Sequence, residues 1–426
     1  MKHIILDDDP TGTQCATDVS VLLGLGVQAD TVVGRLITAL RSEDAVFILT
    51  NSRALSPGDA VDLVTRIRDA AVEAASILGI EQPRFILRGD STLRGHVFAE
   101  SDIFATENSV LLFVPAFPSG GRVTRHGIHY VQLGEHLTPA AETEYARDPV
   151  FGFTASDMAG YVHERGGLRP VVSVPLDSLR TSAGHALTHA LITAESGAVV
   201  APDAVTNADI GLVHRGLVRA WAEGRNVVVR CAAPLAAYCA QVYSSDELLA
   251  QPLERPAGGV LVVCGSHTSG ATTQLDALAS TLNLHAAVLD TDTALADPES
   301  AGRDLAARAR ADLASRGVAV IASERQRRND DNTLVHGARV MRALTTAVHV
   351  LRDDVAAVVA KGGITSAEVA FTGLGATTAR VRGQLSAGVS VWDLAAAGGA
   401  IPYVVVPGNV GSPDVLVAAL RALDGA

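Results

Sequence analysis

Short apolar runs rich in β-branched residues recur along this chain, and stretches with helical periodicity separate them. Such alternation is typical of βαβ units, in which crossover helices join parallel strands. The predicted strands of the first half lie at residues 4–6, 19–23, 46–49, 85–87, 110–114, 171–174, 198–201 and 227–230. Those of the second half lie at residues 260–263, 286–289, 318–321, 356–359 and 403–406. The pattern predicts an α/β fold.

The length of the chain argues for two domains. Its 426 residues exceed what one hydrophobic core usually organises, since single domains rarely grow beyond about 250–300 residues. Residues 244–259 read SSDELLAQPLERPAGG, and the prolines and paired glycines of this polar stretch are typical of a linker. We therefore predict domains at residues 1–245 and 258–426, each with a mostly parallel sheet flanked by helices.

Composition restricts the class of ligand and the compartment. No apolar run approaches the roughly 18 residues that span a bilayer, there is no signal-peptide pattern, and the four cysteines are scattered without a CxxC pair. These features predict a cytoplasmic protein without a membrane segment. The formal net charge of −12 argues against nucleic-acid binding, because that affinity comes from clustered Lys and Arg. A small-molecule substrate is favoured.

The densest candidate chemistry follows the first predicted strand, where Asp7, Asp8 and Asp9 stand in a row before Pro10. Ligands of open parallel sheets bind at the carboxyl ends of the strands. Adjacent carboxylates repel one another unless a cation, an arginine or a substrate hydroxyl balances them. A solvated Asp-Pro turn is the alternative interpretation, but the position on the first strand favours a functional one.

A second candidate segment, with Arg88, Asp90 and Arg94, follows the predicted strand at residues 85–87. A helix that begins near Leu93 would offer backbone N–H groups to an anion. The guanidinium groups beside that point match a carboxylate bidentately. The segment therefore predicts an anion site, with surface ion pairs between the arginines and nearby carboxylates as the alternative.

A proline- and glycine-rich loop at residues 115–122 follows the next predicted strand and ends in Gly121 and Arg122. Rigid loops at this edge of a sheet usually shape a pocket. Three histidines near this loop have no carboxylate or fourth ligand at a supporting spacing, so we predict no dedicated metal site.

Three Gly-rich turns follow strands of the second half, at residues 264–270, 361–366 and 407–411. Turns of this kind offer N–H groups and hydroxyls to phosphate oxygens. Because each turn follows a strand of the same domain, we expect the three to converge along one edge of the sheet. They predict a nucleotide site that is not a P-loop, since no GxxxxGK motif followed by Ser or Thr occurs.

Another glycine turn leaves a different class of protein open. Residues 24–29 read GLGVQA after a predicted strand and have the spacing of a dinucleotide fingerprint. Taken alone, this turn would indicate a nicotinamide-dependent oxidoreductase. The spacing is frequent by chance, and the turn does not follow the first strand.

In these motifs the chain resembles the four-carbon acid sugar kinase family, which includes 3-oxo-tetronate, D-threonate and D-erythronate kinases. The resemblance runs through both halves. It rests on the residues at 8–12, 51–55, 90–95, 115–122, 265–266, 362–365 and 408–411, together with Gln274.

The resemblance implies an ATP-dependent transferase of carbohydrate metabolism that phosphorylates a hydroxyl, at C4, of a four-carbon sugar acid. The N-terminal domain would hold the sugar acid and the C-terminal domain ATP. Asp9 or Asp8 would be the general base, with Asp90 as the alternative. The implied substrate-binding residues are Arg53, Ser91, Arg94, Gly95, Gly121 and Arg122. The implied nucleotide-binding residues are Ser266, Thr268, Gly362, Gly363, Ile364, Thr365, Gly408, Asn409 and Gly411.

The resemblance further implies Mg²⁺ held mainly by ATP phosphates and waters, so no metal cage need appear in the sequence. It also implies a homodimer. A non-catalytic nucleotide or metabolite sensor derived from such a kinase is the alternative from another class.

Overall fold

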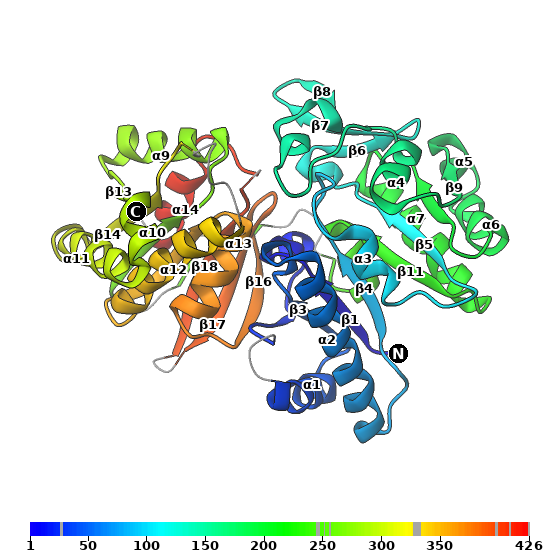
Figure 1. Cartoon of the computed structure of the whole chain (residues 1–426), viewed down its shortest axis with the longest axis horizontal. Helices are drawn as coiled ribbons and strands as arrows, with labels where there is room; N and C mark the ends of the chain where they lie inside the picture. Colours follow the sequence, from blue (N-terminus) through cyan, green and yellow to red (C-terminus); the bar gives the residue numbers. More distant parts are fainter. Residues whose placement is uncertain are drawn as a thin grey trace. The chain divides into compact units, whose positions relative to one another are not determined.

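The computed structural model describes residues 1–25, 29–243, 248–250, 252–254, 257–326, 334–396, 399–408 and 410–424. It divides into two compact units. Unit 1 consists of Met1–Cys15 and Leu25–Tyr243, and unit 2 of Ala16–Gly24 and Ser244–Ala426. Each unit is an α/β structure with helices beside a sheet, as predicted (Figure 1).

The sheet of unit 1 is entirely parallel among its described strands. In spatial order the strands are β3 (Ala45–Leu49), β1 (His3–Asp7), β4 (Arg84–Arg88), β11 (Val227–Cys231), β5 (Val110–Val114), β10 (Val199–Pro202) and β9 (Val171–Val174). Strands β1, β3, β5 and β11 are buried along their whole length. Burial on both faces explains why they read as continuous apolar runs rather than alternating ones.

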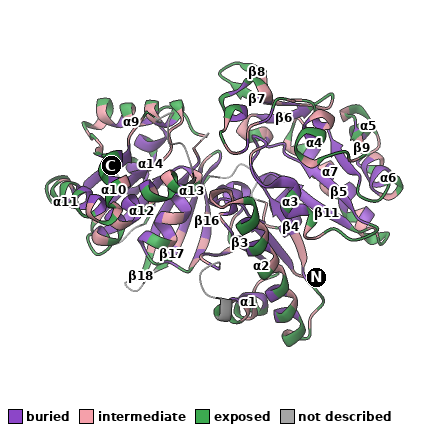
Figure 2. Ribbon diagram, viewed as in Figure 1, coloured by how far each residue is buried: buried purple, intermediate pink, exposed green. Residues whose placement is uncertain are grey.

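Helices of unit 1 cover this sheet. They are α1 (Ala29–Ser42), α2 (Pro57–Leu78), α3 (Val97–Asp102), α4 (Met158–Gly166), α5 (Leu176–Thr181), α6 (His185–Thr193), α7 (Asn207–Ala222) and α8 (Ala233–Ala240). Local sequence sets their ends: the hydroxyl of Ser56 caps α2 by accepting from the N–H of Asp59, and Gly79 ends that helix in the left-handed conformation. Figure 2 shows the exposed outer faces of the helices and the buried strands.

A separate antiparallel sheet, which the sequence analysis did not predict, extends unit 1. It consists of β6 (Arg122–Arg125), β7 (Ile128–Leu133) and β8 (His136–Pro139). Its first strand begins at Arg122, so the sheet carries one of the predicted substrate-binding residues.

The sheet of unit 2 is mixed. The strands β13 (Ala287–Leu289), β14 (Val318–Ser323), β12 (Gly259–Cys264), β15 (Val355–Lys361) and β18 (Gly399–Val406) are parallel neighbours in that order. They are followed by the antiparallel strands β17 (Val389–Ala396), β16 (Thr378–Ser386) and β2 (Ser20–Leu22). Neither β16 nor β17 was predicted from the sequence; in β16, arginine and glycine interrupt the apolar pattern.

The helices of unit 2 are α9 (Ser269–Leu282), α10 (Thr291–Ala296), α11 (Pro298–Arg316), α12 (Leu334–Leu351), α13 (Gly363–Glu368) and α14 (Val415–Asp424), with a π-helical turn at Val369–Gly373. Asp297 caps α11 through the N–H of Ser300, and Gly317 ends it. No helix in the described ranges is long and apolar enough to cross a membrane.

The segment Ala16–Gly24 corrects the predicted domain boundary. The sequence analysis placed it within residues 1–245, but its strand β2 pairs with β16 of unit 2. The side chain of Thr17 also donates to the carbonyl of Arg382, 365 residues away in the sequence. A hydrogen-bonding edge of a sheet accepts any strand of suitable register, so sequence order alone does not reveal this exchange.

Candidate functional site

The carboxyl ends of β1 and β4 bring acids and arginines together in unit 1. The two strands are parallel neighbours, and their register sets Asp7 opposite Arg88. The guanidinium of Arg88 lies 3.0 Å from an oxygen of Asp7 and 2.6 Å from an oxygen of Asp9. Asp7 also accepts from the N–H of Gly12 at 3.0 Å. Arg88, the last residue of β4, therefore holds the acidic turn after β1 against β4.

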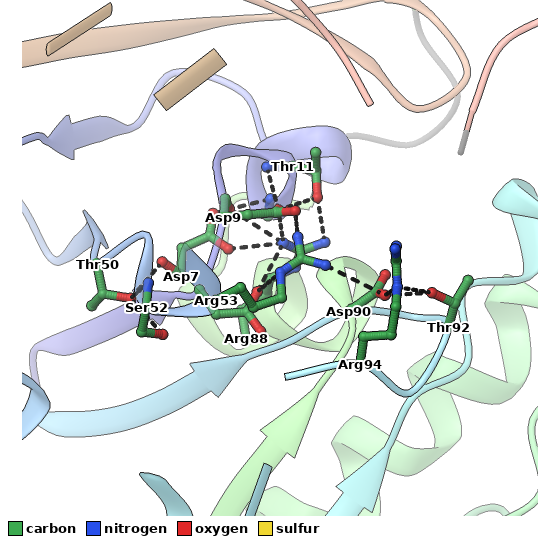
Figure 3. Close-up of polar contacts among 12 residues, drawn as sticks. Asp7, Asp9, Thr11, Thr50, Ser52, Arg53, Arg88, Asp90, Thr92 and Arg94 are labelled. Carbon is green, nitrogen blue, oxygen red and sulfur yellow. Dashed lines mark hydrogen bonds and ion pairs between the residues drawn. The ribbon is translucent and has the colours of Figure 1, made fainter. Parts of the chain in front are cut away.

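Asp9 faces several donors at once. Its Oδ1 accepts from the N–H and the hydroxyl of Thr11, and its Oδ2 is paired with the guanidinium of Arg53. Figure 3 shows Arg53 between Asp9 and Asp90, and its Nη1 lies 3.4 Å from Asp90. Arg53 therefore joins the acidic turn after β1 to the loop after β4.

Asp90 is held as a carboxylate by the cations around it. It accepts from the Nε of Arg94 at 2.7 Å and from the hydroxyl of Thr92. Burial by itself would raise its pKa, but the charges of Arg94 and Arg53, with these hydrogen bonds, hold the pKa of Asp90 well below its usual range. An acid whose lone pairs are occupied in this way accepts a proton poorly.

Asp8 lies 3.5 Å from the guanidinium of Arg53 and 3.7 Å from that of Arg88, and it has a further partner in Arg230. Its Oδ2 lies 3.0 Å from the guanidinium of Arg230, which donates to Glu100 at 2.5 Å. Its Oδ1 is buried without a hydrogen bond in the described residues. Arg230 had no role among the predictions, and Glu100 was considered only as a surface partner of Arg88 or Arg94. The sequence does contain a signal for Arg230, which is the one charged residue of the otherwise apolar strand β11. An arginine is almost never fully buried unless it is paired.

We call these nine residues the carboxylate–arginine cluster: Asp7, Asp8, Asp9, Asp90, Glu100, Arg53, Arg88, Arg94 and Arg230. All of its carboxylates are buried, as are Arg88 and Arg230, while Arg53 is 10% exposed. Burial raises the pKa of Asp7 to about 7 and raises that of Asp8, although neighbouring arginines oppose both shifts. The cluster is an arrangement of nearly balanced charge.

The loop after Asp90 corrects one expectation. No helix begins near Leu93; α3 begins at Val97, and Leu93 adopts a left-handed conformation. The loop is instead held from outside, since the ring of His129 contacts the carbonyl of Ser91 at 2.8 Å. At Gly95, with a φ of 121°, an added Cβ would lie 3.0 Å from Asp8. Only glycine allows the loop to pass this close to the acid.

Arg94 is the most exposed arginine of the cluster, with 22% of its side chain accessible. Its guanidinium lies 5.2 Å from the ring centre of Tyr145. Burial lowers the pKa of Arg122, and Tyr145, Asp90 and Arg94 are the charged or titratable groups around it. Gly121 ends the short turn before β6 in a left-handed conformation. The structure thus brings all the predicted residues of unit 1 into one region.

The three adjacent aspartates could in principle hold a metal ion, because their carboxylates lie within 4.8 Å of one another. Their donor set does not fit a Mg²⁺ cage, since every one of them is already paired with arginine. Only an oxygen such as Asp8 Oδ1 could contribute one ligand to an ion held mainly by other groups.

The three Gly-rich turns of unit 2 converge as expected, because β12, β15 and β18 are parallel neighbours. A Cβ added at Gly265 would lie 2.3 Å from the hydroxyl oxygen of Thr365. One added at Gly408 would lie 3.1 Å from Ser266 Oγ and 3.9 Å from the Cα of Gly362. We call Gly265, Ser266, Thr268, Gly362, Gly363, Thr365 and Gly408 the glycine-turn cluster.

Side-chain donors fix the last of these turns. The hydroxyl of Thr268, which also caps α9, donates to the carbonyl of Gly408 at 2.7 Å. The amide of Gln274 donates to the carbonyls of Gly411 and Ser412 at 3.2 and 3.1 Å. With these carbonyls occupied, backbone N–H groups and hydroxyls are the groups of this turn that can meet an anion.

The remaining predicted nucleotide residues differ in position. Gly363 begins α13, and the side chain of Ile364 is 38% exposed. Gly411 has a positive φ in the loop held by Gln274. Asn409 lies outside the described residues.

The glycine turn at residues 24–29 follows β2, whose residues belong to unit 2. Its strand β2 is antiparallel to β16, whereas the fingerprint belongs to a parallel βαβ unit. A Cβ added at Gly24 would lie 1.9 Å from the ring of Phe371. Gly24 therefore makes room for an aromatic side chain, and residues 26–28 lie outside the described residues.

Each half of the chain matches a known domain family. Residues 3–239 match a family described as a sugar-binding N-terminal domain. Residues 261–416 match a family described as a nucleotide-binding C-terminal domain. The chain therefore belongs to a class of proteins that combine a sugar-binding and a nucleotide-binding domain. The two clusters agree with this class. The chain belongs to the four-carbon acid sugar kinase family.

Named relatives are similar to this chain at moderate identity. A D-threonate kinase of Bordetella bronchiseptica is 28% identical over 397 residues, which cover 90% of this chain and 87% of that protein. A D-erythronate kinase of Heliobacterium modesticaldum is 29% identical over 263 residues. That second match covers 60% of this chain and about half, 54%, of the relative.

Solved structures share the fold. A Salmonella typhimurium LT2 protein matches with a TM-score of 0.67 at 18% identity, over 99% of both chains. A Haemophilus influenzae protein matches with a TM-score of 0.61 at 19% identity, over 98% of this chain and 99% of its own. At this identity the likeness concerns the fold alone.

Proposed function

We propose that this chain is an ATP-dependent kinase that phosphorylates a hydroxyl, at C4, of a four-carbon sugar acid such as 3-oxo-tetronate, threonate or erythronate. Unit 1 binds the sugar acid and unit 2 binds ATP. The carboxylate–arginine cluster carries this proposal, because it combines a candidate base with cations for a carboxylate at the ends of parallel strands. The D-erythronate and D-threonate kinases are relatives with this type of activity.

Asp8 is the base in this proposal, ahead of Asp9 and Asp90. Asp9 accepts hydrogen bonds from Thr11 and Arg88 and pairs with Arg53. Asp8 Oδ1 accepts no hydrogen bond in the described structure, and the guanidiniums of Arg53 and Arg88 lie 3.5 and 3.7 Å from it. Burial raises the pKa of Asp8 toward the range that suits proton transfer. Asp8 accepts the hydroxyl proton as the sugar oxygen bonds to the γ-phosphorus and ADP leaves.

Arg94 is the proposed contact of the sugar carboxylate, with Arg122 beside it. Arg53 is a weaker candidate than the sequence suggested, because Asp8, Asp9 and Asp90 already surround its guanidinium. Arg94 pairs with Asp90 through Nε, and its partner at Nη1, Asp148, is 3.8 Å away. A guanidinium engaged on one side can receive a carboxylate on the other.

The glycine-turn cluster is the proposed site of the ATP phosphates, which its N–H groups and hydroxyls would bind. Mg²⁺, when bound with ATP, neutralises charge on the phosphates. The phosphates and waters would supply most of its ligands.

A coupled assay of ADP release over a panel of four- to six-carbon sugar acids tests the proposal. We expect turnover with at least one four-carbon acid and none without a sugar acid. ATP binding without turnover on any acid would contradict the kinase and favour the sensor. The homodimer and the cytoplasmic location remain predictions, and size-exclusion chromatography with light scattering tests the first.

A further inference from the structure

Lys361 is a buried cation of unit 2 to which the sequence analysis gave no role. It is the last residue of β15 and precedes Gly362, and its side chain has no accessible surface. Its Nζ donates to the carbonyls of Pro407 and Val410, at 2.5 and 3.2 Å. Lys361 thus lies next to Gly362 of the glycine-turn cluster and holds the turn after β18.

No carboxylate pairs with Lys361 among the described residues. Its hydrogen-bond partners are neutral carbonyls, and the groups that act on its charge are the Cys264 thiol and the guanidinium of Arg325. A buried charge without a counter-charge is costly, and proteins normally pair it or place it where a ligand completes the pair.

Arg325 is a second such cation at the same turns. It follows β14 and donates to the carbonyl of Ser266 at 2.5 Å and to the hydroxyl of Thr272 at 3.2 Å. None of its contacts within the described ranges is to a carboxylate. Ser266 belongs to the glycine-turn cluster, so both cations contact the turns that form it.

The three glycine turns themselves contain no acid, although Glu368 and Asp414 follow two of them. Glu324, next to Arg325, accepts from the N–H of Thr291. Residues 264–274, 361–367 and 407–413 lack Asp and Glu, in a chain whose formal net charge is −12. Two cations that no carboxylate pairs with in the described residues therefore contact turns that contain no acid of their own. The group that can balance them is an anionic ligand.

We propose that Lys361 and Arg325 supply the positive charge that the phosphates of the nucleotide neutralise in unit 2. This inference rests on the proposed function. Arg325 is partly exposed and can contact a phosphate directly. Lys361 is a positioning residue, because it is fully buried and fixes the turn after β18 through its hydrogen bonds. Its positive charge acts on the phosphates without direct contact.

Calorimetric titration of ATP, ADP, AMP and adenosine into Lys361→Met and Arg325→Gln, without any sugar acid, tests the inference. Each variant should weaken ATP binding about tenfold or more, since a hydrogen bond to a charged group is lost. The loss should shrink as phosphates are removed, and adenosine binding should stay within about twofold of wild type. Arg310→Gln is the matched control, because Arg310 is an exposed arginine of unit 2 paired with Asp354.

Equal losses for ATP and adenosine would mean that the two side chains only hold the fold, and would overturn the inference. Unchanged ATP binding in both variants would overturn it as well. If Lys361→Met fails to fold in a thermal scan, the partly exposed Arg325→Gln decides alone. A wild-type chain that binds no nucleotide would overturn the proposed function too, whereas wild-type binding with unaffected variants would overturn this inference only.

Discussion

The two candidate clusters treat charge in opposite ways. In unit 1, five buried carboxylates lie among four arginines, two of them buried, so that the charges nearly cancel. In unit 2, the glycine-turn cluster offers hydroxyls and backbone, with two cations that no carboxylate of the described structure balances. The first arrangement suits orienting a hydroxyl and moving a proton, and the second suits accepting a polyanion. The difference shows that the two units are suited to ligands of different charge.

The largest expected effect comes from removing the proposed base from the balanced cluster. Asp8→Asn should lower kcat about a thousandfold, because general-base catalysis contributes about 10²–10⁴-fold. ATP affinity should change little, since the proposed nucleotide site lies in the other unit. The control is Asp69→Asn, an acid whose side chain is 62% exposed. Steady-state kinetics with ATP titrations measure both quantities, and an unchanged kcat would remove Asp8 as the base.

Breaking the charge balance should cost stability. Arg230→Met leaves Asp8 and Glu100 buried without their shared cation, and such a loss costs about 3–5 kcal/mol. The exposed pair of Arg310 with Asp354 should matter far less, so Arg310→Met should cost within about 1 kcal/mol. Urea denaturation compares the two variants. Equal free energies of unfolding would contradict the contrast between buried and exposed pairs.

The turns of unit 2 should depend on close approach rather than on charge balance. Gly265→Ala should cost about 1–3 kcal/mol and weaken ATP binding, because its methyl group would displace Thr365. Gly270 offers a matched control near the same turn, since a Cβ there meets nothing within 4 Å. Gly270→Ala should leave the free energy of unfolding unchanged or raised. A tolerated Gly265→Ala would mean that the turns do not need their observed contact.

The smallest effect concerns pH. Burial, with the nearby charge of Arg325, lowers the pKa of Lys361 to about 8, and the group returns to its usual pKa on unfolding. Between these two values the unfolded chain binds the extra proton, so stability rises as pH increases through 8 and is lost as pH falls. From pH 7 to pH 9 the wild type should gain about 1 kcal/mol relative to Lys361→Met. If the free energies of unfolding of the two proteins change in parallel with pH, Lys361 is not a buried charge without a counter-charge.

Much of both clusters could be predicted because it follows from strand ends. The acidic turn after β1, the loop with Asp90 and Arg94, and the three glycine turns each follow an apolar run, and parallel strands bring such turns to one edge. The helix expected near Leu93 was wrong, because the loop is held by side chains from outside, such as His129. Capping residues in a short segment do not reveal such contacts.

The sequence by itself determined the α/β alternation, the family, and which turns carry polar groups. Only the tertiary structure decided which cation faces which acid, and which cations have no acid. Asp8 and Arg230 are 222 residues apart in the sequence, and Lys361 reaches Pro407 across 46. Such pairs depend on the order and register of strands in a sheet, and strand β2 crosses to the sheet of unit 2. Local patterns fix the elements, but long-range strand pairing fixes their neighbours.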